Sequence, residues 1–151
     1  MKNKSVLLIL LLFILANCGF EPIYSSKKSN FNIGKIKIAE KNKFNSIIKY
    51  NLKNISNNES QNKFDLIINS EKKKIISSKD AKGNPELLTI IISVKVQIIK
   101  DNVIKNKKNF SQSFGYSNIS NKFSLAQYEK DIEKNLINKI IENISTYLLS
   151  L

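Results

Sequence analysis

The thiol of Cys18 is the side chain whose position in this sequence indicates chemistry most directly. Cys18 is the only cysteine among 151 residues, and it comes shortly after an apolar run over residues 6–15. A single cysteine forms no intramolecular disulfide and no cysteine-based metal site. A thiol in this position can instead carry acyl chains, each CH₂ of which contributes about 0.8 kcal/mol to membrane binding. The sequence therefore predicts lipid attachment at Cys18.

The residues before Cys18 have the parts of a secretory signal: two lysines, the apolar run of residues 6–15, and two small residues. A membrane-spanning helix needs about 20 apolar residues, whereas an apolar stretch of about 7–15 residues is typical of a signal peptide. Residues 15–18, Leu-Ala-Asn-Cys, resemble the bacterial lipobox, with Asn17 where Gly, Ala or Ser is usual. We expect residues 1–17 to be a lipoprotein-type signal peptide. The alternative is an ordinary exported protein with an unmodified thiol.

Carboxylates gather at Glu129, Asp131 and Glu133, but no catalytic partner accompanies them. The chain has no histidine, the commonest general base and a frequent metal ligand, and its four glycines form no phosphate-binding loop. Acidic residues near the start of a helix are stabilised by the helix dipole, which explains the cluster without catalysis. We therefore expect no enzyme, no cofactor and no metal site.

Lysines form two groups that could meet phosphates. Residues 72–74 are three consecutive lysines within an expected strand, and Lys79 and Lys82 flank the turn that follows. A lysine ammonium binds phosphate as a point charge rather than as a bidentate fork. Two interpretations remain open: a solvated strand end, or a cluster that contacts the phosphates of an anionic glycolipid.

The net charge also favours an anionic partner. The sequence holds 25 basic residues, all lysine, against 12 acidic residues, for a formal charge of +13. Such an excess attracts lipid headgroups, phosphates or acidic protein surfaces. We exclude nucleic acid, because the export signal removes the chain from the cytoplasm. The abundance of lysine, isoleucine and asparagine is also typical of an AT-rich genome, so part of the excess carries no functional information.

Period-two alternation predicts four strands after residue 32. The third gives the strongest signal, because its even-numbered residues from 88 to 98 are all apolar, and such a face must be covered. Residues 80–85 have the composition of a turn. The predicted strands are residues 33–40, 64–76 and 87–99, and a segment in which Phe110, Phe114 and Tyr116 share one face.

Two segments have the 3.6-residue period of amphipathic helices. The first follows Asn42, which can cap it. The second is expected to begin at Ser124, where Gln127 would complete a capping box. Phe123 would pack on Tyr128 as a hydrophobic staple.

These elements predict one α+β domain over residues 33–151. The order β-α-β-β-β-α would place both helices on one face of a four-stranded mixed or antiparallel sheet. About 130 residues remain after the signal, enough for one hydrophobic core. Residues 18–32, which contain several serines and Pro22, are expected to be the lipidated N-terminus and a tether.

Two stretches resemble the LPS-assembly lipoprotein LptE family, especially its alphaproteobacterial branch. Residues 18–24 are Cys-Gly-Phe-Glu-Pro-Ile-Tyr, similar to the Cys-Gly-Phe-x-Pro-x-Tyr start of that family. Residues 116–118 and 123–126 precede a long helix that is first acidic and then apolar, as in the family. The absence of arginine and the scarcity of alanine depart from typical members.

The resemblance implies two partners and a location. Members of the family sit as a plug inside the outer-membrane β-barrel LptD, help it to assemble, and contact lipopolysaccharide on its way to the cell surface. Gly19 agrees with the outer membrane, because an aspartate at this position typically keeps a lipoprotein in the inner membrane. On this hypothesis Lys79 and Lys82 are the candidate lipopolysaccharide contacts. The alternative is an outer-membrane lipoprotein with a structural or adaptor role unrelated to lipopolysaccharide.

Overall fold

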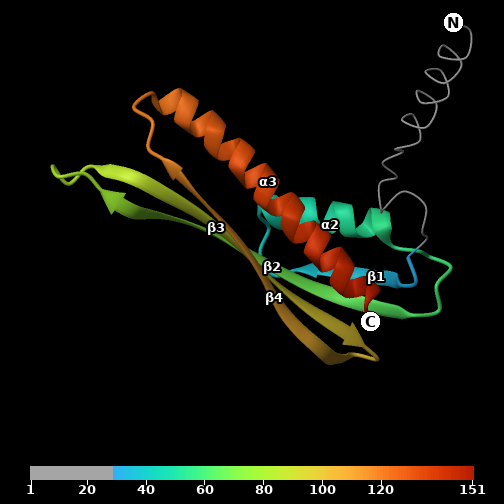
Figure 1. The fold of residues 1–151 in the computed structure, drawn as a ribbon. Coiled ribbons are helices and arrows are strands. Elements are labelled where there is room, and N and C mark those ends of the chain that lie inside the picture. Colours follow the sequence, from blue (N-terminus) through green and yellow to red (C-terminus); the bar gives the residue numbers. More distant parts are fainter. Residues whose placement is uncertain (1–28) are drawn as a thin grey trace, which may run out of the picture.

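The computed structural model describes residues 29–151, which form one sheet with two helices on the same side (Figure 1). The order β-α-β-β-β-α and the four-stranded mixed sheet confirm the predicted α+β fold. The elements are β1 (Asn32–Ile38), α2 (Lys43–Ile55), β2 (Lys63–Lys79), β3 (Pro85–Lys100), β4 (Val103–Ser117) and α3 (Lys122–Leu149).

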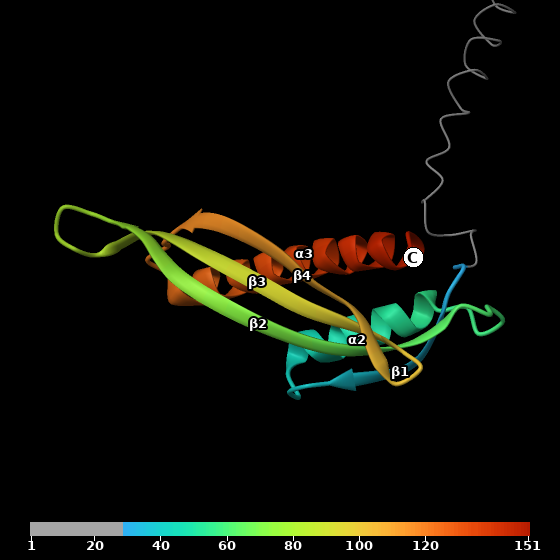
Figure 2. The same ribbon diagram turned by 90° about the horizontal axis from the view of Figure 1, so that it is seen from below.

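The strands lie in the sheet in their sequence order. β1 pairs in parallel with β2, because α2 provides the crossover between them. β2, β3 and β4 are successive antiparallel neighbours. They have 17, 16 and 15 residues, whereas β1 has 7. The β2–β3 hairpin therefore extends well beyond β1 and α2, as Figure 2 shows.

One face of the sheet is apolar and lies beneath both helices. In β3, every even-numbered residue from 88 to 98 is buried, which confirms the predicted register. β2 contributes Leu66 and Ile68, and α3 contributes Ile140 and Ile144, all four with 0% exposure. Full burial of each such side chain contributes about 1.5–3 kcal/mol to folding. No described helix covers the opposite face of the sheet.

The start of α2 is fixed by one asparagine. The side chain of Asn42 accepts a hydrogen bond from the backbone N–H of Asn45 at 2.8 Å, so the predicted cap is confirmed. The same side chain donates to the carbonyl of Ser70 in β2 at 3.2 Å, and the Ser70 hydroxyl donates back to its oxygen at 3.0 Å. The cap therefore also ties α2 to the sheet.

α3 begins earlier than the predicted capping box. Its N-cap is Asn121, whose side chain accepts a hydrogen bond from the backbone N–H of Ser124 at 3.0 Å. Phe123 is 83% exposed, so the predicted staple is wrong. The Tyr128 ring instead packs edge-on against Tyr116, with 6.0 Å between centroids. Asparagine and serine are both good caps, so local pattern does not choose between them.

β4 is longer than the aromatic alternation predicted. It begins directly after a two-residue turn in which Asp101 and Asn102 have φ of 53° and 60°. Aspartate and asparagine tolerate this left-handed conformation and favour tight hairpins. Phe110 and Tyr116 are buried, as expected for core residues, but Phe114 is 45% exposed on this edge strand.

The N-terminal predictions lie mostly outside the described residues. The signal peptide at 1–17 and the lipid attachment at Cys18 fall there. Near the end of the predicted tether, Phe31 is fully buried, and its ring centroid lies 5.7 Å from that of Phe64. Packed structure therefore begins before residue 33. Within residues 29–151, no helix is long and apolar enough to cross a membrane.

The register of β3 can be tested by placing one charge on each face. Val94 has 0% exposure, and its cross-strand neighbours Ser70 and Phe110 carry no positive charge to pair with a carboxylate. Val94→Asp should therefore lower the free energy of unfolding by more than about 3 kcal/mol. Lys95→Asp, one residue on and exposed, should change it by about 0.5 kcal/mol. Urea denaturation measures both, and the reverse order would mean that the register is off by one residue.

Candidate functional site

Lys79 and Lys82 lie at the end of the β2–β3 hairpin, on a turn organised by Asp80. One carboxylate oxygen of Asp80 accepts hydrogen bonds from the backbone N–H groups of Lys82 and Asn84, at 2.9 and 2.8 Å. The side-chain amide of Asn84 and then these backbone groups lower the pKa of Asp80. Gly83 has φ of 84°, which glycine adopts without strain. The turn therefore has a fixed conformation, with a carboxylate between the two lysines.

The hairpin tip carries two exposed lysines, but its net formal charge is zero. Neither Lys79 nor Lys82 has an ion-pair partner within residues 29–151, and both are exposed. Residues 79–86 contain these two lysines and two acids, Asp80 and Glu86, so their formal charges sum to zero. The structure thus brings both candidate lysines to one exposed turn, and two carboxylates come with them.

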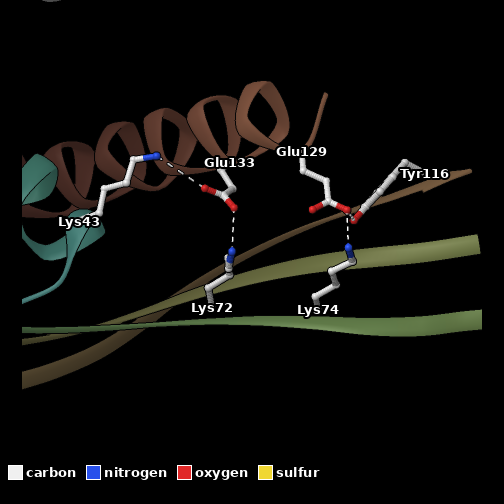
Figure 3. A network of polar contacts seen from close by, with 6 residues as sticks. All are labelled: Lys43, Lys72, Lys74, Tyr116, Glu129 and Glu133. Atoms are coloured by element: carbon white, nitrogen blue, oxygen red, sulfur yellow. Dashed lines mark hydrogen bonds and ion pairs between the residues drawn. The ribbon is translucent and has the colours of Figure 1, made fainter. Parts of the chain in front are cut away.

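Two of the three lysines at residues 72–74 reach α3 while remaining partly exposed to solvent. The Nζ of Lys72 lies 2.8 Å from Oε1 of Glu133, and the ammonium of Lys74 donates to Glu129 (Figure 3). The two glutamates have side-chain exposures of 12% and 18%, so these ion pairs are partly shielded from water.

Each glutamate has a second partner from another element. Lys43, at the start of α2, lies 3.7 Å from Oε2 of Glu133. The hydroxyl of Tyr116 in β4 donates to Glu129 at 2.7 Å. The network in Figure 3 therefore joins α2, β2 and β4 to one helix.

Burial and hydrogen bonding oppose each other at Glu129. Burial disfavours the charged carboxylate, but the hydrogen bonds from Lys74 and Tyr116 outweigh it, so the pKa of Glu129 is lowered. Burial, followed by the hydrogen bond to Glu129, raises the pKa of Tyr116. The tyrosine therefore stays a neutral donor, and the glutamate stays a charged acceptor.

This arrangement adds a structural role to residues 72–74. Lys72 and Lys74 pair with α3, while their side chains stay 41% and 42% exposed to solvent. Lys73 points to the opposite face and pairs with Glu71 at 3.3 Å.

The helix dipole does not explain the carboxylate cluster either. The first turn of α3 contains no acidic residue, because the helix begins at Lys122. Glu129 and Glu133 face the sheet, whereas Asp131 is exposed. Among residues 29–151, no group of three or more histidine, cysteine, aspartate or glutamate side chains could hold a metal ion.

The structure also contains a basic hollow that the sequence analysis did not single out. It has a volume of about 260 Å³ and lies on β3 and on β4, an edge strand. In the antiparallel register Gln97 lies opposite Lys107. The Lys108 ammonium sits 4.2 Å from the centre of the Tyr147 ring. The residues come together only through the pairing of β3 with β4, so the sequence alone does not reveal them. The hollow is lined by Lys95, Gln97, Lys107, Lys108 and Asn109.

No protein-family model matches the sequence, and no curated protein matches it. Solved structures of lipoproteins have a similar fold. A minor lipoprotein from Acinetobacter baumannii has a TM-score of 0.59, with 11% identity over 77% of this chain and 89% of the other. An uncharacterized lipoprotein B from Nitrosomonas europaea has a TM-score of 0.56, with 11% identity over 84% and 88%. For the rare lipoprotein B from Shewanella oneidensis, the TM-score is 0.51, with 12% identity over 78% and 92%.

Glu129→Gln should destabilise the protein at neutral pH and have less effect in acid. The folded state lowers the pKa of Glu129, so its contribution is present above the unfolded value of 4.5 and is lost as the pH falls through the folded value. Hydrogen bonds to a charged group contribute about 1.5–3 kcal/mol. The difference in unfolding free energy from wild type should therefore shrink below pH 4.5.

Urea denaturation at a series of pH values measures this difference. Asp131→Asn is the matched control on the same helix, since its side chain is exposed, and should have little effect at any pH. A Glu129→Gln penalty of the same size at neutral and acidic pH would contradict the ion-pair assignment.

Proposed function

We propose that this protein is an exported lipoprotein of the outer membrane, attached through acyl chains on Cys18. Lysines, a short apolar run and a thiol follow one another as in a lipoprotein signal. The fold gives independent support, because it is similar to the folds of lipoproteins from three bacteria. Stable anchoring takes more than one acyl chain, and lipoproteins usually carry several.

Within this class, the best-supported function is that of the LptE family: plug and assembly partner of the LptD β-barrel, in lipopolysaccharide transport to the cell surface. The observation that carries this proposal is the long sheet with helices on one side only. Its open face can lie along the inner wall of a barrel. The resemblance of residues 18–24 to the family's N-terminal motif supports the same function.

Small side chains on the open face favour close approach of a partner. The hydroxyl oxygens of Ser77 and Thr89 lie 2.6 Å apart, and those of Ser93 and Ser111 lie 2.9 Å apart. These hydroxyls satisfy one another across neighbouring strands, so burial of this part of the face would leave few of them unpaired. This part of the face therefore suits a lasting contact with another protein surface.

The β2–β3 tip is the candidate contact with lipopolysaccharide. It projects farthest from β1 and α2 (Figure 2), and Lys79 and Lys82 have no ion-pair partner in the described part of the chain. The zero formal charge of residues 79–86 favours the alternative, a structural or adaptor role without lipopolysaccharide. The two functions make different predictions for purified protein.

The lipid anchor can be tested by metabolic labelling. Wild-type protein should incorporate a labelled fatty acid, and Cys18→Ala should not, because the chain has no other thiol. The variant should stay uncleaved or leave the membrane. Unlabelled wild type, or a labelled Cys18→Ala variant, would contradict the lipoprotein assignment.

Affinity purification from detergent-solubilised membranes tests the function. A large β-barrel protein and lipopolysaccharide should both co-purify with the full chain. Lys79→Glu with Lys82→Glu should reduce bound lipopolysaccharide and its sensitivity to salt, because screening acts over about 8–10 Å at physiological ionic strength. The barrel should be retained, since that contact would spread over the open face.

Lys130→Glu with Lys134→Glu is the matched control, because it makes the same charge change on exposed residues of α3. It should leave lipopolysaccharide binding unchanged. A barrel without lipopolysaccharide would favour the structural role, and the absence of any barrel would contradict the plug.

A further inference from the structure

A hollow of about 600 Å³ lies between β1 and α2. Ile36 and Ile38 of β1 supply apolar side chains, and Tyr50 stands at its border with 70% exposure. The face of α2 that lines this hollow differs from the face that meets α3, where Phe44 and Ile47 lie. The hollow, called here the β1–α2 groove, is therefore open on the side of α2 away from α3. Its lining residues are Ile36, Ile38, Lys41, Ser46, Lys49, Tyr50 and Lys53.

The lining of the β1–α2 groove contains three lysines and no carboxylate. Lys53 is held in place, because its ammonium donates to the carbonyls of Ile33 and Gly34 at 3.1 and 2.9 Å. Lys41 and Lys49 are exposed and have no ion-pair partner within residues 29–151. Residues 32–55 contain six lysines and one glutamate. This surface, unlike the hairpin tip, has a large positive excess.

An apolar floor beneath a cationic rim fits the boundary of an anionic lipid layer. Tyrosine is enriched at this boundary, where its ring meets the acyl region and its hydroxyl meets the headgroups. Lysines beside an anionic leaflet bind its phosphates. A protein partner fits less well, because lysine is depleted at the centres of protein interfaces.

The chain enters the domain beside this groove. The hydroxyl of Ser29 donates to the carbonyl of Ile55, at the C-terminal end of α2, at 2.5 Å. Ten residues, 19–28, separate Ser29 from Cys18, and they can span at most about 35 Å. If Cys18 carries the anchor, as in the proposed function, the groove stays within reach of the bilayer.

We propose that the β1–α2 groove binds the phosphate headgroups of anionic phospholipids at the membrane surface, with Tyr50 entering the interface. Lys41 and Lys49 supply the main attraction, and Lys53 fixes one charge at the end of β1. The domain then lies against the membrane by a defined surface rather than hanging freely from its tether. This contact rests on the proposed function in one respect, because the anchor at Cys18 brings the groove close to the membrane. The binding itself comes from the side chains of the groove.

Tryptophan fluorescence tests the contact, because the chain has no tryptophan of its own. Full-length Tyr50→Trp protein is purified in detergent and attached to phosphatidylcholine vesicles with or without phosphatidylglycerol, both with brominated acyl chains. Its emission should shift to the blue and be quenched on the anionic vesicles. Phe123→Trp, at the opposite end of the domain and 83% exposed in the native protein, should stay unquenched.

Charge removal gives the matched comparison. Each lysine beside an anionic surface favours binding by a factor of about five. Lys41→Gln with Lys49→Gln, in the Tyr50→Trp protein, should therefore lower the docking equilibrium roughly 25-fold. Lys130→Gln with Lys134→Gln should leave it unchanged.

Vesicle sedimentation separates failure of the groove from failure of the anchor. Protein that sediments with anionic vesicles while its Tyr50→Trp emission stays unquenched would overturn the groove and leave the anchor standing. Equal quenching on both kinds of vesicle, or quenching unaffected by Lys41→Gln with Lys49→Gln, would overturn the role of charge. Protein that does not sediment at all would overturn both groove and anchor.

Discussion

The position of α3 over the long apolar face of β2 and β3 is the constraint on which the rest of the fold depends. Toward its C-terminus the helix is held by buried side chains such as Ile140 and Ile144. Closer to its N-terminus, where Leu125 and Ile132 are also buried, Glu129 and Glu133 reach lysines of β2. Each glutamate also has a second partner, Lys43 or Tyr116, and the lysines are partly exposed, so the network as a whole matters more than any single ion pair. It links the first half of α3 to β2, and α2 packs beside the helix.

Positive charge in this chain has several uses, so net charge alone does not locate a site. Lys72 and Lys74 pair with glutamates of α3, and the lysines of the hairpin tip are balanced by two acids. The lysines of the β1–α2 groove have no such compensation in its lining. The two proposed contacts with anionic groups, at the hairpin tip and at the β1–α2 groove, lie at opposite ends of the domain (Figure 2).

Much of the fold could be predicted because its signals are local. Period-two alternation gave the face of β3 buried from residue 88 to 98, and Asn42 marked the start of α2. The start of α3 was missed because Asn121 and Ser124 are both competent caps. The role of Glu129 could not be predicted, since its partner Lys74 is 55 residues away. The β1–α2 groove depends on how α2 is rotated about its own axis relative to β1. The spacing of residues in the sequence does not determine this rotation.

β4 leaves one row of backbone N–H and C=O groups unpaired along the edge of the sheet, and such an edge can recruit a strand from another copy. The register shift between Ile98 and Ile99 leaves Lys105 without an opposite residue, which makes a bulge in the strand. Lys107 and Lys108 follow it. A second copy adding a strand here would meet a distorted ladder and a row of lysines, and both features disfavour the pairing of edge strands.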